Sequence, residues 1–170
     1  MTKNPKNQTM KKNVVAGLGE IGRPILKLLS KRNTTIGFDL NPDLMDQRKF
    51  ERYKDLETSF LHIAIPVTAK FINNILKLEK KFNPECIVIH STIKPGTTKK
   101  LQERLSIPVI YSATRGVHRR MIYDLKRYTK FFTISKNAPR SKWASLEFVR
   151  SMKKCGIKTK KMSKPETLEL

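Results

Sequence analysis

The sequence predicts an α/β fold in which a doubly wound parallel sheet carries helices on both faces. Short apolar runs alternate with segments of helical period along most of the 170 residues, and the first run passes directly into a glycine-rich turn and a helix. Several later runs are almost continuously apolar, as strands that are covered on both faces must be. This alternation implies right-handed crossovers between parallel strands. The length suits one domain or slightly more.

The composition is that of a globular but very basic chain. Hydrophobic residues make up 38%, enough for a core of ordinary size, and the net charge is +22. Such a charge either attracts polyanions or reflects a general lysine bias on a solvated surface. The lysines are spread over every predicted helix, which favours the second interpretation. Nucleic acid is not the expected partner, because no binding motif or aromatic stacking pattern accompanies the lysines.

The start of the chain and its cysteines bear on location. Residues 1–12 are polar, with four lysines and no acid, and predict a basic flexible arm rather than a signal peptide. No stretch approaches the roughly 20 apolar residues of a membrane span. Cys86 and Cys155 lie in different settings and predict reduced thiols, without a disulfide framework or a metal cluster. We therefore expect a cytoplasmic protein with no membrane attachment.

Residues 13–30 contain the motif around which the chain is organised. An apolar strand enters Gly17-x-Gly19-x-x-Gly22, and a helix follows without a gap. In this pattern the first glycine permits a tight turn, the second lets a phosphate approach the backbone, and the third lets the helix lie close to the sheet. The helix N-terminus then faces the pyrophosphate of a dinucleotide. Glu20 would repel a phosphate and is expected to point away from it.

An acid follows at the distance that a dinucleotide site requires. Residues 34–38 predict a strand that ends in Asp39, about 20 residues past the glycines. A carboxylate there accepts hydrogen bonds from the adenosine ribose hydroxyls and repels a 2′-phosphate, which favours NAD over NADP. The alternative is that residues 39–42 form only a turn. The glycines at the right distance favour the ribose role.

The remaining elements continue the alternation. In order, they are a short helix and loop over 42–57, a strand over 59–65, a helix over 68–81, a strand over 86–90, a helix from near Gly96, a further strand, a helix over 124–128, a strand over 130–134, a helix over 141–154, and an edge strand or loop over 157–162. The apolar face of the helix over 141–154 is expected to comprise Trp143, Leu146, Phe148, Val149 and Met152. Because parallel strands end at one edge of a sheet, we expect Asp39, Pro66 and Ser91 to mark the binding site. His62 and His90, within or beside strands, are expected to be structural.

One further segment indicates a family. Residues 91–97 read Ser-Thr-Ile-Lys-Pro-Gly-Thr and follow the fourth apolar run, after the glycine motif, Asp39 and the strand that ends at Pro66. In this order and setting, the chain resembles the N-terminal NAD-binding domain of the UDP-glucose/GDP-mannose dehydrogenase family, over residues 13–170. The resemblance implies a Rossmann-like domain of an oxidoreductase that transfers a hydride from a sugar alcohol to NAD. The nucleotide-sugar would be its substrate.

The resemblance also implies roles for individual residues. Pro66 and Val67 would lie beside the dinucleotide, and Thr92 would lie near the nicotinamide, where its hydroxyl helps to hold a water or substrate group at the reacting carbon. Ser91 or Thr92 could also simply cap the helix that begins near Gly96. The implied cofactor-binding residues are Gly17, Leu18, Gly19, Glu20, Ile21, Gly22, Asp39, Pro66, Val67 and Thr92, with Leu18 to Ile21 along the pyrophosphate.

The chain departs from the family after its next strand. The family has a Pro-Glu-Phe segment whose glutamate takes part in the chemistry, whereas here no carboxylate occurs between Glu103 and Asp124. Arg115 is a candidate partner for a substrate carboxylate or phosphate. His118 is a candidate acid or base. Both are equally consistent with surface positions in a basic loop.

The last residues predict the start of another helix. Ser163, Pro165 and Glu166 form a capping-box pattern, so that 13–162 is the NAD-binding domain and 163–170 the start of a helix that leads to absent domains. In the family those domains carry the catalytic lysine, asparagine and cysteine. The sequence therefore leaves open whether the chain is an enzyme by itself.

Two alternatives to a dehydrogenase of this family remain. The first is a non-catalytic NAD-binding module or one subunit of a split enzyme, completed by a C-terminal catalytic chain or a homo-oligomer. The second is a relative of the beta-hydroxyacid and 6-phosphogluconate dehydrogenases. That group shares the glycine loop but is not expected to have the segment at residues 91–97.

Overall fold

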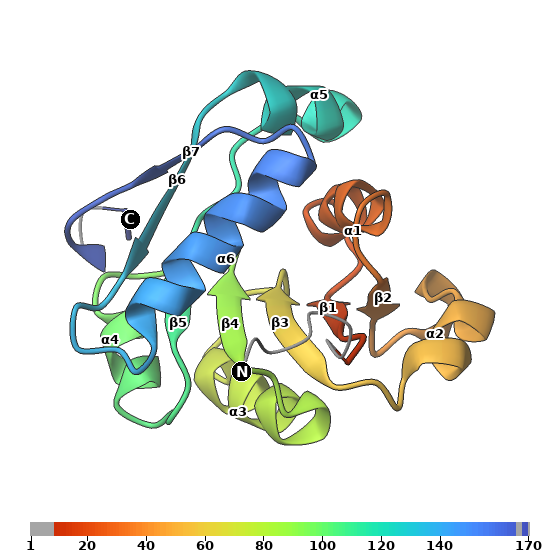
Figure 1. Cartoon of the computed structure of the whole chain (residues 1–170), viewed down its shortest axis with the longest axis horizontal. Coiled ribbons are helices and arrows are strands. Elements are labelled where there is room, and N and C mark those ends of the chain that lie inside the picture. Colours follow the sequence, from red (N-terminus) through yellow and green to blue (C-terminus); the bar gives the residue numbers. More distant parts are fainter. Residues whose placement is uncertain (1–8, 166–167, 170) are drawn as a thin grey trace, which may run out of the picture.

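A computed structural model describes residues 9–165 and 168–169 (Figure 1). Over these residues seven strands form one sheet in the order β2-β1-β3-β4-β5-β6-β7. The strands are β1 (Lys12–Ala16), β2 (Thr35–Phe38), β3 (Thr58–Ile63), β4 (Cys86–Ile89), β5 (Val109–Tyr111), β6 (Lys130–Ile134) and β7 (Thr159–Lys161). The helices are α1 (Gly22–Ser30), α2 (Gln47–Tyr53), α3 (Phe71–Phe82), α4 (Thr97–Gln102), α5 (Met121–Arg127) and α6 (Ser141–Lys154), and two short 3-10 helices cover Pro42–Leu44 and His118–Arg120. The Rossmann-like α/β fold predicted from the alternation is confirmed.

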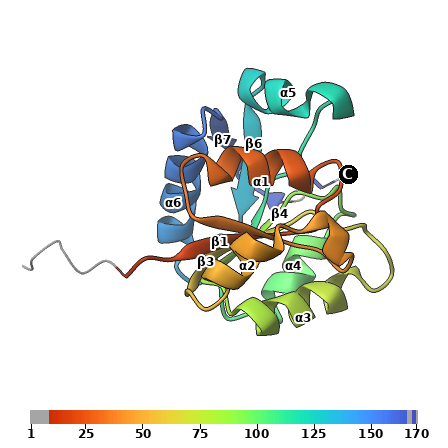
Figure 2. The same ribbon diagram turned by 90° about the vertical axis from the view of Figure 1, so that its right-hand side faces the viewer.

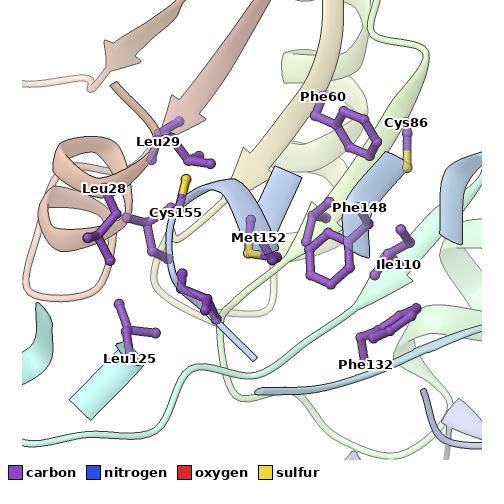
Figure 3. Close-up of a cluster of buried hydrophobic side chains, with 14 of the residues drawn as sticks. Leu28, Leu29, Phe60, Cys86, Ile110, Leu125, Phe132, Phe148, Met152 and Cys155 are labelled. Carbon is purple, nitrogen blue, oxygen red and sulfur yellow. The ribbon is translucent and has the colours of Figure 1, made fainter. Parts of the chain in front are cut away.

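Helices cover both faces of the sheet. Figure 2 shows α1 and α5 on one side of the strands and α2, α3 and α4 on the other. The α1, α5 and α6 side is filled by one buried cluster, in which Phe132 and Phe148 pack with their ring centroids 5.0 Å apart (Figure 3). A second cluster, which includes Ile75 and Leu101, fills the other side. Strands between two apolar layers are buried on both faces, which explains their continuous apolar runs.

The sheet is parallel from β2 to β5, but β6 is antiparallel to β5. Tyr111 pairs with Thr133, and Ile110 pairs with Ile134. The predicted parallel sheet therefore contains one antiparallel strand, β6. The reason is the connection, because α5 stays beyond the ends of the strand arrows instead of crossing back over the sheet (Figure 1), and β6 begins three residues after α5 ends. As a result the first residue of β6 lies at the carboxyl edge of the parallel strands.

The ordered sheet begins earlier than the sequence suggested. Lys12, which the sequence places in the basic arm, is instead the first residue of β1 and is only 3% exposed. Its ammonium group donates hydrogen bonds to the carbonyl oxygens of Lys54 and Leu56. The neighbouring Lys11 forms ion pairs with Glu57 and Glu85. The high lysine content of this segment wrongly predicts an exposed arm, because the polar head of Lys12 finds acceptors while its stem is buried.

The helix over 141–154 has the predicted bounds, but its predicted apolar face is partly wrong. Leu146 and Val149 are exposed, whereas Ala144, Phe148 and Met152 are buried. These three residues are spaced four apart, so α6 buries one narrow stripe. Trp143 is half-buried beside this stripe, with its ring stacked on Phe60 at a centroid distance of 5.8 Å.

The end of the described chain folds back on the same domain. Leu168 packs against the cluster on the α3 and α4 side, and the Glu169 carboxylate accepts the backbone N–H groups of Gly96 and Thr98. The predicted capping box includes Glu166, so the helix expected over 163–170 lies partly outside the described residues. Residues 159–161 form β7 at the edge of the sheet, which is the strand of the two alternatives that the sequence left open. No helix in the described part of the chain is both long and apolar enough to cross a membrane.

Candidate dinucleotide site

The three glycines of the loop between β1 and α1 are there for different structural reasons. Gly17 has φ +90°, and a Cβ there would lie 2.5 Å from the carbonyl oxygen of Ala64. A Cβ on Gly22 would collide with the carbonyl group of Gly17, because the helix lies directly against the turn. A Cβ on Gly19 would meet nothing within 4 Å. Gly17 and Gly22 are therefore needed by the fold, whereas Gly19 leaves open the space in front of the helix.

Asp39 ties the end of β2 to this loop. Its Oδ2 accepts the backbone N–H of Leu18 at 2.8 Å, and its Oδ1 accepts that of Asn41 at 2.9 Å. Residues 39–41 thus also form the turn that the sequence offered as the alternative, and Asn41 caps the 3-10 helix that follows. Each oxygen of Asp39 keeps a further lone pair for a hydroxyl group. Leu18 itself is buried and its N–H is engaged, so it has no free donor for a phosphate.

These residues border a cleft of about 960 Å³ at the carboxyl ends of β1 to β4. The cleft lies where the chain order of the strands reverses, with β2 on one side of β1 and β3 on the other, which is where α/β sheets bind their ligands. Eight of the sequence-predicted residues line it, namely Gly17, Gly19, Glu20, Ile21, Asp39, Pro66, Val67 and Thr92. Leu18 and Gly22 lie behind the loop in the buried layer.

Sequence reasoning missed one wall of the cleft. Asn74, Lys77, Leu78 and Lys81 of α3 line it, opposite the glycine loop. Lys81 Nζ also lies 5.2 Å from the ring centroid of Phe38, which borders the cleft beside Asp39. The signal was present, because positions 74, 78 and 81 recur at helical spacing on the side of α3 next to the core residues Phe71 and Ile75, and Leu78 itself packs against the buried cluster. The sequence pattern identified only the apolar face.

Ser91 and Thr92, in the segment after β4, have separate roles. Ser91 is buried and its hydroxyl donates to the carbonyl oxygen of Ile65 at 2.7 Å, which ties the ends of β3 and β4 together. Thr92 is exposed to the cleft. The alternative that one of them caps α4 is wrong, because the residue before this helix is Gly96 and the N–H of Thr98 in its first turn is accepted by the Glu169 carboxylate. The hydroxyl of Thr92 is therefore available to a bound molecule.

The candidate catalytic residues Arg115 and His118 do not line the cleft. His118 Nε2 lies 2.8 Å from Glu20 Oε2, and both side chains are largely exposed. Glu20 therefore leans from the rim of the cleft toward the segment before α5, in keeping with the expectation that it avoids a phosphate. Arg115 lines a separate cavity of about 380 Å³ beyond the end of β5. Of the three candidate catalytic residues, only Thr92 lies in the cleft.

The cleft has the features that a dinucleotide requires. The N-terminus of α1 lies next to the space left open by Gly19, Asp39 lines the cleft beside the loop, and apolar side chains such as Ile65 and Leu78 form the walls. A pyrophosphate would lie at the helix N-terminus and an adenosine ribose at the carboxylate. The fold and the cleft define a Rossmann-like α/β domain with an open cleft at the carboxyl edge of its sheet.

Solved structures share this fold. A UDP-D-ManNAc dehydrogenase from Pyrococcus horikoshii aligns with a TM-score of 0.72 and 18% identity over 93% of this chain and 48% of that one. A UDP-glucose dehydrogenase from Pyrobaculum islandicum aligns with a TM-score of 0.70 and 15% identity, over 98% of this chain and 49% of that one. A prephenate dehydrogenase from A. aeolicus, in complex with hydroxyphenyl propionate and NAD+, gives 0.65 and 15% identity, with 93% and 62% covered.

These similarities establish the fold. The chain spans about half the length of the two UDP-sugar dehydrogenases. No protein-family model matches the sequence, and no curated protein matches it. The resemblance inferred from the sequence is thus confirmed at the level of the fold.

Proposed function

We propose that this chain is the NAD-binding domain of an oxidoreductase related to the nucleotide-sugar dehydrogenases. The observation that carries the proposal is the cleft, in which the open space at Gly19 and the carboxylate of Asp39 stand at the two places where a dinucleotide needs them. The prephenate dehydrogenase structure with NAD+ shares this fold and supports the assignment. Bound NAD would supply a hydride acceptor.

NAD rather than NADP is the expected cofactor. Asp39 carries its charge at the ribose end of the cleft, where a 2′-phosphate would be repelled. Lys77 and Lys81 on α3 supply positive charge nearby, which attracts either dinucleotide. The carboxylate therefore decides between NAD and NADP, because it attracts a ribose hydroxyl as a hydrogen-bond donor but repels a 2′-phosphate.

The substrate and the completion of the enzyme are further parts of the proposal. A nucleotide-sugar alcohol would be oxidised near Thr92, whose hydroxyl faces the cleft. Since residues 104–123 contain no carboxylate and the chain spans about half of its UDP-sugar dehydrogenase neighbours, the remaining catalytic groups would come from a further segment, a second chain or another copy. The same observations favour a second candidate, a module that binds NAD without turnover.

Calorimetric titration with NAD and NADP tests the binding proposal. The wild-type chain should bind NAD and bind NADP more weakly. Asp39→Asn keeps an acceptor for the Leu18 N–H but removes the charge, so it should reduce the preference. Gly19→Val should abolish NAD binding without changing the thermal midpoint, because its side chain enters open space.

Two results would contradict this assignment. If neither dinucleotide binds the wild-type chain at millimolar concentration, the cleft is not a cofactor site. If Gly19→Val binds NAD as tightly as the wild type, the pyrophosphate does not lie at the loop. Turnover of nucleotide-sugars with NAD, alone or with a partner chain, separates the dehydrogenase from the binding module.

A further inference from the structure

A row of four buried polar side chains crosses four neighbouring strands at the carboxyl edge of the sheet. His62 belongs to β3, His90 follows β4, Thr114 follows β5, and Lys130 opens β6. Each is less than a tenth exposed. The antiparallel register of β5 and β6, in which Tyr111 pairs with Thr133, brings Thr114 opposite Lys130. The reversed direction of β6 is what places a lysine at this edge.

Hydrogen bonds connect the row from end to end. Lys130 Nζ lies 2.9 Å from Thr114 Oγ1, which lies 3.3 Å from His90 Nδ1, and His90 Nε2 lies 2.9 Å from His62 Nδ1. Lys130 Nζ also donates to the carbonyl oxygens of Ser112 at 2.8 Å and Ala113 at 3.2 Å. The row is therefore continuous, and its lysine has three acceptors for its three protons.

This connectivity allows two orders of hydrogen bonding. With Lys130 charged, the ammonium donates to Thr114, the hydroxyl donates to His90 Nδ1, and His90 Nε2 donates to His62. With Lys130 neutral, every bond reverses. The Thr114 hydroxyl then donates to the amine, His90 Nδ1 donates to the hydroxyl, and His62 Nδ1 donates to His90 Nε2. Loss of one proton from the lysine thus exchanges the tautomer of both imidazoles.

The charge states of the groups suit such an exchange. Burial lowers the pKa of Lys130 to about 7, so the amine changes its charge near neutral pH. Burial also lowers the pKa of His62 to about 3, and burial together with the Lys130 charge lowers the pKa of His90. Both imidazoles therefore stay neutral while Lys130 titrates, and only their tautomers change.

Lys130 lines the cavity of about 380 Å³ together with charged and polar groups from other elements. Arg115 comes from the loop after β5, Asp124 from α5, and Tyr128 from the segment before β6. Asp124 Oδ2 accepts the Val117 N–H at 3.0 Å, but its buried Oδ1 has no partner among the described residues. A ligand hydroxyl would satisfy this oxygen, and Arg115 would attract a negative group on the same ligand.

The cavity is next to the proposed nicotinamide end of the cleft. The Thr114 N–H donates to the His90 carbonyl oxygen at 3.1 Å, so the segment after β5 runs beside the segment after β4. The latter carries Thr92 into the cleft. Neighbouring strands lie about 4.8 Å apart, so a hydroxyl compound in the cavity would lie beside the segment that carries Thr92.

We propose that Lys130 accepts the proton of a substrate hydroxyl bound in this cavity, and that Thr114, His90 and His62 form a proton relay behind it. The assignment rests on the proposed function. When the alcohol becomes a carbonyl, the C–H electron pair leaves as hydride to NAD and the O–H proton passes to the lone pair of the neutral Lys130 amine. The substrate hydroxyl replaces Thr114 as the donor to this lone pair, and the ammonium that forms donates to Thr114 instead. This supplies an acid-base group in a chain that lacks a carboxylate in residues 104–123.

Nitrogen NMR of histidine-labelled full chain, with separate detection of the Lys130 side chain, tests the relay between about pH 5.5 and 9.5. In the wild type, both imidazoles should exchange tautomers with one midpoint, equal to the pKa of Lys130. In Lys130→Met the tautomers should stay constant. Thr114→Val should keep the Lys130 titration but uncouple the imidazoles from it.

Three outcomes would overturn the relay. These are constant tautomers in the wild type while Lys130 titrates, no titration of Lys130 in this range, or the same tautomer exchange in Lys130→Met. The wild-type titration decides by itself if a variant does not fold. Both variants should bind NAD like the wild type, because neither Thr114 nor Lys130 lines the cleft.

A comparison of NAD with ADP-ribose tests whether Lys130 serves the reacting end. The nicotinamide ring of NAD is cationic, and ADP-ribose lacks it, so NAD should lower the tautomer midpoint by about half a pH unit more than ADP-ribose does. Equal midpoints with both bound would overturn the role of Lys130 as proton acceptor. If neither nucleotide binds but the tautomers still exchange, the proposed function and the substrate role of Lys130 fall together, whereas the relay stands.

Discussion

At the residue scale, the glycine motif separates what the fold needs from what a ligand needs. Gly17 and Gly22 have no room for a side chain, because a Cβ on either would meet the backbone. Gly19 has room, and the space it leaves belongs to the cleft. A single substitution at Gly19 can therefore remove binding without unfolding the chain. Glycine thus occurs in this motif for two different physical reasons.

Also at the residue scale, Lys130 should make stability depend on pH. Its pKa is about 7 in the folded chain, against an ordinary value of 10.5. Between these values the unfolded chain holds a proton that the folded chain has released, so the free energy of unfolding should rise with pH from about 7 to about 10. Below pH 7 the cost of burying the charge is fully present.

Urea unfolding of the wild type and of Lys130→Met at several pH values measures this effect. The difference between the two proteins isolates Lys130 from the other lysines and tyrosines that titrate in the same range. The wild type should gain stability relative to Lys130→Met as the pH rises through this window. A constant difference would mean that Lys130 keeps its ordinary pKa despite its burial.

At the element scale, α6 shows how little of an apolar helix is needed to cover a sheet. Phe148 is 1% exposed and packs on Phe132, whereas Leu146 is 66% exposed. Phe148→Ala should lower the free energy of unfolding by about 3–5 kcal/mol, because it leaves a cavity in the core. Leu146→Ala should change it by no more than about 0.5 kcal/mol.

Chemical denaturation of these two variants tests the assignment of the buried stripe. Both substitutions replace a large apolar side chain by alanine on the same helix, so each serves as the control for the other. Equal losses of stability would show that Leu146 is covered in solution. The helical period alone does not distinguish them, because both residues belong to the face predicted from the sequence.

At the scale of the whole molecule, the net charge of +22 should oppose compactness. Screening shortens the Debye length from about 30 Å at about 10 mM salt to about 8 Å at about 150 mM. The thermal midpoint should therefore rise over this range, because mutual repulsion between lysines is weakened. Differential scanning calorimetry in NaCl and in choline chloride would measure it. A midpoint that falls in both salts would show that ion pairs outweigh the repulsion.

The order of the elements and the glycine loop could be predicted from the sequence because they depend on neighbouring residues. Alternating periods distinguish strands from helices, and the Gly17 to Gly22 spacing with Asp39 beyond it marks a cleft at one sheet edge. Eight predicted residues do meet in that cleft. The wall from α3 was missed because the apolar period of a helix says nothing about the polar positions beside it, here Asn74, Lys77 and Lys81.

The sequence by itself determined the fold class, the helix bounds of α6 and the position of the cleft, since each follows from local pattern and chain order. Only the tertiary structure decided the direction of β6, the burial of Lys12 and the meeting of His62, His90, Thr114 and Lys130. These four residues span 69 positions, from 62 to 130, and no period relates them. What joins them is the pairing of strands, and strand pairing depends on contacts between residues that are far apart in the chain.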